Sequence, residues 1–172
     1  MTKEAAFAAL YATHYRQVRA LCRQLLGTTE RADDAAQEAF VRAYRGFAAY
    51  DSVQPFGPWI MRIARNHSLD LLRRRRFEPS TFGAEAEEAA AAEADDADGL
   101  GELLTAERAR SVQAAVSALP ERYRVPLALA YFADASYDEI AVELGITRTH
   151  VGTLLCRAKQ ALRKTLAEET AS

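Results

Sequence analysis

Apolar residues recur with a helical period along almost the whole chain, and this periodicity restricts its fold more than any other feature. In residues 3–26 they follow the i, i+3, i+4, i+7 spacing of an amphipathic helix, and Gly27 then ends that helix. We expect His14 and Cys22, which lie on this apolar stripe, to be core residues. Further helices are expected over about 30–46, 58–72, 103–118, from Pro120 onward, 136–144 and 148–167. No segment has the alternation of a strand, so the sequence predicts an all-α fold.

Charge is unevenly distributed along the 172 residues, although the net charge is only −2. Residues 1–79 carry 13 Lys and Arg against 8 Asp and Glu, whereas residues 80–107 carry 9 acidic residues and no basic one. Residues 108–172 are again basic, with 9 Lys and Arg against 7 Asp and Glu. Because like charges repel, we expect an acidic flexible linker over 80–104 between two small helical domains, 1–79 and 105–172. Basic domains of this kind favour nucleic acid as a partner.

The second half of the first domain combines aromatic residues with arginines, and both side-chain types bind single-stranded nucleic acid. The irregular stretch between Gly46 and Pro58 is rich in aromatic rings, which can stack on an unpaired base. The helix that follows bears several arginines and ends in the run Arg73 to Arg76, and an arginine can bind a phosphate through two hydrogen bonds. The candidate nucleic-acid contacts are Phe47, Tyr50, Phe56, Trp59, Arg62, Arg65, Asn66, Arg73 and Arg74.

The second domain carries the sequence pattern of a helix-turn-helix. Ser136 and Glu139 form a capping box at the start of a short helix, which Gly145 ends. Thr147 caps the final helix, which we expect to be the recognition helix that enters the major groove of DNA. The residues expected off its buried stripe are Arg148, Thr149, His150, Gly152, Thr153, Cys156 and Arg157. Among them, the DNA contacts that we predict are Arg148, Thr149, His150, Thr153 and Arg157.

Several classes of function find no support in the sequence. Two cysteines cannot form a disulfide framework or a four-cysteine zinc site, and the three histidines are dispersed. The sequence contains no Gly-rich phosphate loop, nucleophile motif or metal-ligand cluster, so we expect no enzymatic activity, cofactor, metal site or small-molecule substrate. Its apolar runs are much shorter than the roughly 18 residues of a membrane helix, and the N-terminus has no signal pattern. We therefore expect a cytoplasmic protein without membrane insertion.

In this order and spacing, the motifs resemble those of the ECF (extracytoplasmic function) sigma factors of bacterial RNA polymerase. The resemblance covers about 5–77 and 105–167. In the first domain it rests on Asp33-Asp34-Ala-Ala-Gln37-Glu38-Ala-Phe40-Val-Arg42-Ala and on Trp59-Ile-Met-Arg62-Ile63-Ala64-Arg65-Asn66 with Asp70 and the Arg run. In the second domain it rests on Leu119-Pro120-Glu121-Arg122 and on Ser136-Tyr-Asp-Glu-Ile-Ala-Val-Glu-Leu-Gly145-Ile146.

This resemblance implies a function for each part of the chain. A sigma factor binds core RNA polymerase, directs it to the −35 and −10 promoter elements and helps to melt the −10 region. The aromatic loop and the helix 59–76 would then read the −10 element, and the helix-turn-helix would read the −35 element. The acidic linker would pass through the active-site cleft and the RNA exit path of the polymerase. The residues implied to bind the clamp helices of core polymerase are Asp33, Asp34, Gln37, Glu38 and Val41.

The chain departs from the family pattern at two places. Gly57 and Pro58 stand where relatives often have a basic residue and Ala, and Gly152 and Leu154 lower the charge of the recognition helix. The family also implies control by a partner, most often an anti-sigma factor, or by the level of synthesis. One alternative is a helix-turn-helix transcriptional regulator that is not a polymerase subunit. A regulator of that kind would need a receiver or ligand-sensing N-terminal domain, whereas residues 1–79 read as helical throughout.

Overall fold

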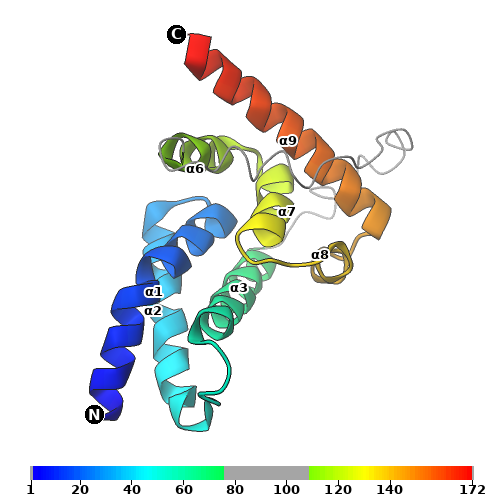
Figure 1. Cartoon of the computed structure of the whole chain (residues 1–172). Helices are drawn as coiled ribbons and strands as arrows, with labels where there is room; N and C mark the ends of the chain where they lie inside the picture. The colour runs from blue at the N-terminus through cyan, green and yellow to red at the C-terminus, as the bar shows by residue number, and fades with distance from the viewer. Residues whose placement is uncertain (1, 76–108, 172) are drawn as a thin grey trace. The chain divides into compact units, whose positions relative to one another are not determined.

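The computed structural model describes residues 2–75 and 109–171, and within these ranges it contains helices and no strand. Contacts between Cα atoms divide the chain into two units, 1–76 and 77–172 (Figure 1). The prediction of an all-α fold is confirmed. The predicted linker over 80–104 lies outside the described residues, so the predicted domain limits stay a prediction.

Three long helices build the first unit, and each packs against the other two (Figure 1). They are α1 (Lys3–Leu26), α2 (Thr29–Gly46) and α3 (Phe56–Arg74), with a short 3-10 turn at Phe47–Ala49 after α2. Gly27 ends α1 with a positive φ of 85°, and its N–H donates to the carbonyl of Arg23, as the sequence predicted. The third helix begins at Phe56, two residues before the expected Pro58. Pro58 therefore lies in the first turn, where backbone N–H groups have no helical partner.

An aliphatic core fills the middle of the first unit. Leu21, Leu25, Ile60 and Leu72 are almost fully buried between the three helices. Cys22 is also fully buried, and the hydroxyl of Ser68 donates to its sulfur at 3.6 Å, which confirms Cys22 as a core residue. Burial raises the pKa of the Cys22 thiol to about 11, so the thiol is protonated and unreactive at neutral pH.

Four helices build the described part of the second unit. They are α6 (Ala109–Ala118), α7 (Glu121–Tyr131), α8 (Tyr137–Leu144) and α9 (Arg148–Ala171), and α9 packs against the other three (Figure 1). The first six residues of the helix predicted over 103–118 lie outside the described residues.

The joint between α8 and α9 has the predicted helix-turn-helix geometry. The hydroxyl of Ser136 accepts the N–H of Glu139 at 3.1 Å and so caps α8. Gly145 follows α8 with a φ of 67°, a left-handed conformation that glycine adopts without steric cost. The hydroxyl of Thr147 then accepts the N–H of His150 at 3.1 Å at the start of α9. These three residues fix where one helix ends and the next begins.

Candidate functional site

The residues predicted to bind polymerase lie on α2. Asp34, Gln37, Glu38 and Val41 follow the i, i+3, i+4, i+7 spacing that places residues on one face of a helix. Asp34, Gln37 and Val41 are exposed, and Glu38 is half-buried. Buried alanines at other positions of α2, such as Ala35 and Ala39, form the opposite side of the helix. We call the four residues Asp34, Gln37, Glu38 and Val41 the α2 row.

Ion pairs distinguish the three acidic residues of this region. The carboxylate of Glu38 accepts a hydrogen bond from Arg42 Nε at 2.9 Å, and this bond lowers the pKa of Glu38. Asp33 pairs instead with the guanidinium of Arg19 on α1, so its carboxylate links the two helices. Asp33 is thus held toward α1, whereas Glu38 pairs within α2 and lies in the α2 row with Asp34.

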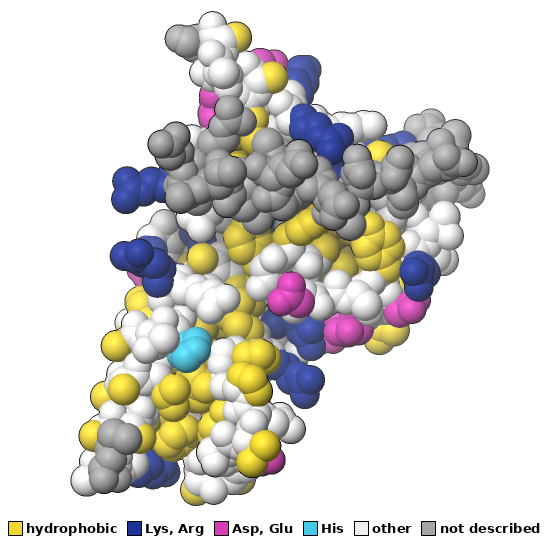
Figure 2. Space-filling model, in the orientation of Figure 1, with side chains coloured by type: hydrophobic (Ala, Val, Ile, Leu, Met, Phe, Trp, Pro, Cys, Tyr) yellow, Lys and Arg dark blue, Asp and Glu magenta, His cyan; other side chains and the backbone are white. Residues whose placement is uncertain are grey.

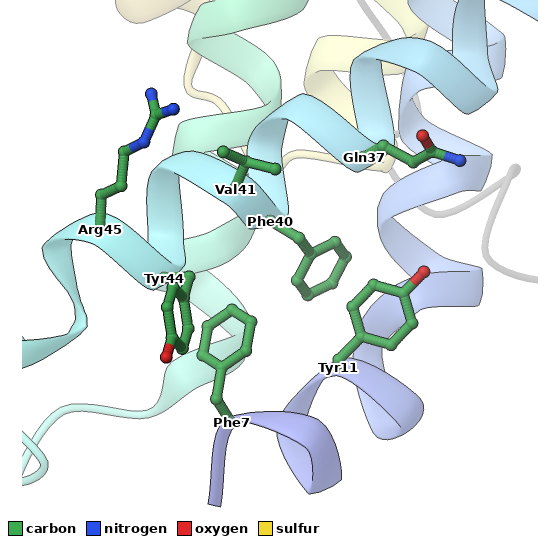
Figure 3. A pocket seen from close by; sticks show the side chains of 7 residues that line it. All are labelled: Phe7, Tyr11, Gln37, Phe40, Val41, Tyr44 and Arg45. Atoms are coloured by element: carbon green, nitrogen blue, oxygen red, sulfur yellow. The ribbon is translucent and has the colours of Figure 1, made fainter. Parts of the chain in front are cut away.

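A groove of about 410 Å³ runs beside the α2 row, between α1 and α2. Figure 3 shows the rings of Phe7 and Tyr11 from α1 facing the ring of Phe40 from α2. The residues that line the groove are Phe7, Tyr11, Gln37, Phe40, Val41, Tyr44 and Arg45. Gln37 and Val41 belong to both the row and the groove, so a polar row and an aromatic hollow form one continuous surface.

The sequence did not indicate that Tyr11, Tyr44 and Arg45 line such a groove. Tyr11 belongs to the apolar pattern of residues 3–26, yet 38% of its surface is exposed, and Tyr44 is 37% exposed. The available signal was the spacing of Phe40 and Tyr44, which places two large aromatic residues one turn apart on the same helix as the acidic residues.

The aromatic residues predicted to contact nucleic acid form a single cluster. The centre of the Tyr50 ring lies 4.7 Å from the centre of the Trp59 ring and 5.8 Å from that of the Phe47 ring, with which it stacks. The hydroxyl of Tyr50 also donates to the carbonyl of Gln54, which closes the loop before α3. In Figure 2, apolar side chains gather at this end of the first unit. Phe47, Tyr50 and Trp59 are half-buried, so each keeps some accessible surface.

Phe56 differs from the other members of this cluster. Only 6% of its surface is exposed, and its ring packs against Phe7 and His14 of α1. The expectation that Phe56 contacts nucleic acid directly is therefore corrected. Phe56, the first residue of α3, faces α1, and this contact anchors the start of α3.

The polar residues predicted on α3 lie at its surface. Arg62, Asn66 and Arg73 are exposed and are spaced so that they fall within one side of the helix. Arg73 pairs with Asp70 one turn away at 3.1 Å. Arg74 is exposed at the end of α3, and Arg65 is half-buried with its Nε 3.4 Å from Asn66 Oδ1.

The candidate contacts on α9 divide into an exposed and a buried group. Arg148 and Thr149 are exposed, and Arg157 is half-buried. His150 and Thr153 are only 5% and 2% exposed, so the expectation that they lie off the buried stripe is wrong. Gly152 and Leu154 are buried as well, so residues 150–155 of α9 are buried over more of the helix circumference than the single stripe that we assumed.

Residues 2–75 and 109–171 contain neither a candidate metal centre nor a candidate membrane span. No group of three or more His, Cys, Asp or Glu side chains is arranged to hold a metal ion. No helix in these ranges combines the length and the apolar character that crossing a membrane requires.

Comparison with known proteins assigns both halves of the chain to conserved regions of sigma-70 factors. Residues 10–78 match the family model for sigma-70 region 2, and residues 109–162 match that for sigma-70 region 4. The ECF RNA polymerase sigma factor SigW of Bacillus subtilis is 31% identical over 95% of this chain and 90% of its own length. The sigma-H factor of Pseudomonas aeruginosa is 30% identical over 94% of this chain and 86% of its own length.

Solved structures show the same fold. CnrH, solved with the cytosolic domain of CnrY, superposes with a TM-score of 0.50 at 25% identity, over 96% of this chain and 90% of its own. The sigma factor RpoE of Bartonella quintana, solved with the anti-sigma factor NepR, superposes with a TM-score of 0.54 at 17% identity. The match covers 94% of this chain and 97% of the RpoE chain. A regulator outside the polymerase is not favoured, because the first unit matches sigma-70 region 2 and not a sensing domain. The chain belongs to the ECF RNA polymerase sigma factors.

Proposed function

We propose that this sigma factor docks on core RNA polymerase through α2, reads the −10 element with the end of the first unit and reads the −35 element with the start of α9. The observation that carries the proposal is the α2 row, whose exposed acidic and amide side chains lie in a chain that also has a DNA-binding helix-turn-helix. All of these features serve binding, so we infer an initiation subunit without catalytic activity of its own.

The α2 row and the groove beside it together suit a basic helical partner. Asp34 and Glu38 present negative charge, which would pair with arginine or lysine side chains of the polymerase clamp helices. Val41 is 42% exposed and lies beside the groove, which would take an apolar side chain of the same partner. Asp33, which pairs with Arg19, would support this surface by joining α1 to α2.

The −10 element would be bound by the aromatic cluster and the polar side of α3. Tyr50 and Trp59 are partly exposed rings on which an unpaired base can stack. Arg62, Arg73 and Arg74 would bind the phosphates of the adjoining strand. Phe56 would hold this surface together from the core.

The −35 element would be read from the first turn of α9. Arg148 and Thr149 are exposed in this turn. In a helix-turn-helix, the N-terminal residues of the recognition helix contact base edges. Arg157 lies farther along the helix and would bind backbone phosphate. We assign His150 and Thr153 to packing, since both are buried.

The remaining partners and the location follow from the family. RpoE of Bartonella quintana and CnrH were both solved with proteins that bind them, an anti-sigma factor and the cytosolic domain of CnrY. We therefore expect an anti-sigma factor for this chain as well. We also expect it to act in the cytoplasm, where RNA polymerase transcribes DNA.

Binding to core polymerase tests the proposal. Fluorescently labelled full-length chain is titrated with purified bacterial core RNA polymerase, and unlabelled chain is used as competitor. A saturable one-to-one complex that the unlabelled chain displaces is expected. A folded chain that shows no saturable binding would contradict the docking proposal.

A further inference from the structure

One acidic residue of the helix-turn-helix contacts the arginine that we assign to the −35 element. Asp138 Oδ2 accepts a hydrogen bond from Arg148 Nη1 at 2.9 Å. The guanidinium of Arg148 also lies 5.9 Å from the centre of the Tyr137 ring. Both partners are exposed, at 66% for the Arg148 side chain and 72% for that of Asp138, so the pair lies at the surface that DNA would approach.

The fold fixes the backbone positions of both residues. Asp138 lies in the first turn of α8, and Arg148 is the first residue of α9. The neighbouring Glu139 serves the cap with Ser136, which leaves Asp138 to face the next helix. Because Gly145 sets the turn between the two helices, the Asp138–Arg148 pair spans the helix-turn-helix itself.

We propose that Asp138 is a positioning residue for −35 recognition, an inference that rests on the proposed role of Arg148. An arginine has five N–H donors, and the bond to Asp138 engages one of its terminal nitrogens. The remaining donors are then held in one orientation, from which they can meet the acceptors of a base edge. A carboxylate at this place also repels DNA phosphates, which reduces binding that does not depend on sequence.

The two effects of Asp138 act on different quantities. Orientation of Arg148 strengthens binding to the correct −35 sequence, whereas repulsion of phosphate weakens binding to every DNA. Removal of the charge should therefore raise affinity for unrelated DNA and lower the ratio of specific to unrelated affinity. An exposed ion pair contributes modestly, so we expect this ratio to fall about two- to fivefold.

Holoenzyme with the Asp138→Asn variant tests the inference, since asparagine keeps the shape and removes the charge. Binding is measured on a promoter duplex identified by run-off transcription and on the same duplex with a scrambled −35 region. Asp134→Asn is the matched control, because Asp134 is an exposed residue of the same unit whose φ of 51° asparagine tolerates. Arg148→Ala and the double variant Asp138→Asn/Arg148→Ala complete a double-mutant cycle.

A fall in the affinity ratio for Asp138→Asn that is absent in Asp134→Asn and absent in the Arg148→Ala background would support the proposal. Equal falls in the affinity ratio for the two Asp→Asn variants would overturn it, because the loss of any negative charge in this unit would then have the same effect. If the affinity ratio is unchanged in Asp138→Asn while Arg148→Ala weakens promoter binding, only the role of Asp138 would be overturned. Unaltered promoter binding by Arg148→Ala would overturn both this inference and the −35 assignment of Arg148.

Discussion

The ring of Tyr50 lies 4.7 Å from the ring of Trp59, with 33° between the two planes. Trp59 is the single tryptophan of the chain, and it lies in the first turn of α3. Tyr50 begins the loop that precedes α3 and Trp59 belongs to α3 itself, so their contact holds the loop over the start of the helix. A base captured here would stack on the exposed faces of this pair.

Replacement of Tyr50 should therefore impair promoter opening more than polymerase binding. Stacking of a base on an aromatic ring contributes about 1–3 kcal/mol, so Tyr50→Ala should shorten the lifetime of open complexes about fivefold or more. Tyr50→Phe keeps the ring but loses the hydrogen bond to Gln54, so its lifetime should lie closer to that of the wild type than to that of Tyr50→Ala. Open-complex lifetime is measured by challenge with a competitor DNA. Equal lifetimes for Tyr50→Ala and the wild type would remove Tyr50 from the −10 contacts.

Reversal of charge at Asp34 should weaken binding to core polymerase. Asp34 is exposed on the α2 row, and an arginine there would face the basic partner that we propose. Because like charges across an interface cost several kcal/mol, we expect at least about a tenfold loss of affinity for Asp34→Arg. Glu168→Arg, at an exposed position of α9, is the control for the change in net charge. The docking surface would have to be placed elsewhere if the two variants bound equally well.

The groove should accept an apolar side chain of the polymerase, so a charge at its edge should be unfavourable. Val41 is 42% exposed and borders the groove, whereas Val142 is 82% exposed on α8. Val41→Asp should lower polymerase affinity about tenfold, because it would bury a charge in an apolar contact. Val142→Asp adds the same charge outside the proposed surface and should bind as the wild type does. The two affinities are compared by competition with labelled wild-type chain, and similar losses would argue against the groove as a contact.

Acidic pH should destabilise the first unit through His67. This residue is 8% exposed, and its charged surroundings are Glu38 and Arg42 on α2 and Asp70 and Arg74 on α3. Burial, followed by the charge of Arg42, lowers the pKa of His67 from its ordinary value of 6.5. The unfolded chain therefore takes up a proton before the folded chain does, and the free energy of unfolding falls as the pH drops below about 6.5.

Urea unfolding followed by Trp59 fluorescence at about pH 7.5 and pH 5.5 measures this effect in the first unit, which contains the single tryptophan. His67→Gln should reduce the difference in stability between the two pH values, because glutamine does not titrate. His150→Gln lies in the second unit and should leave this transition unchanged. A pH dependence of undiminished size in His67→Gln would show that other groups cause it.

Local signals in the sequence were sufficient for most of the helix boundaries. Gly27 and Gly145 end α1 and α8 in left-handed conformations, and Ser136 caps α8, all as predicted. These features depend on the residue and its near neighbours, so they can be read without knowledge of tertiary contacts. The apolar period also identified Cys22 as a core residue of α1, whereas His14, which was expected beside it in the core, is only half-buried.

The surface of the site depended on tertiary contacts that a single helix does not reveal. Thr153 and His150 are buried although they lie off the apolar stripe of α9, and periodicity within one helix does not encode such burial. The groove arises where Tyr11 of α1 meets Phe40 of α2, two residues far apart in the sequence. Likewise, the pairing of Asp33 with Arg19 distinguishes it from its neighbour Asp34 only in the folded unit.

Transcription by reconstituted holoenzyme tests the central claim most directly. Purified bacterial core RNA polymerase is combined with the full-length chain and given sheared genomic DNA of the source organism, and run-off transcripts are mapped. Discrete transcripts that require the chain and share sequence elements near −35 and −10 are predicted. Polymerase that binds the folded chain but yields the same transcripts as core enzyme alone would contradict promoter recognition by this protein.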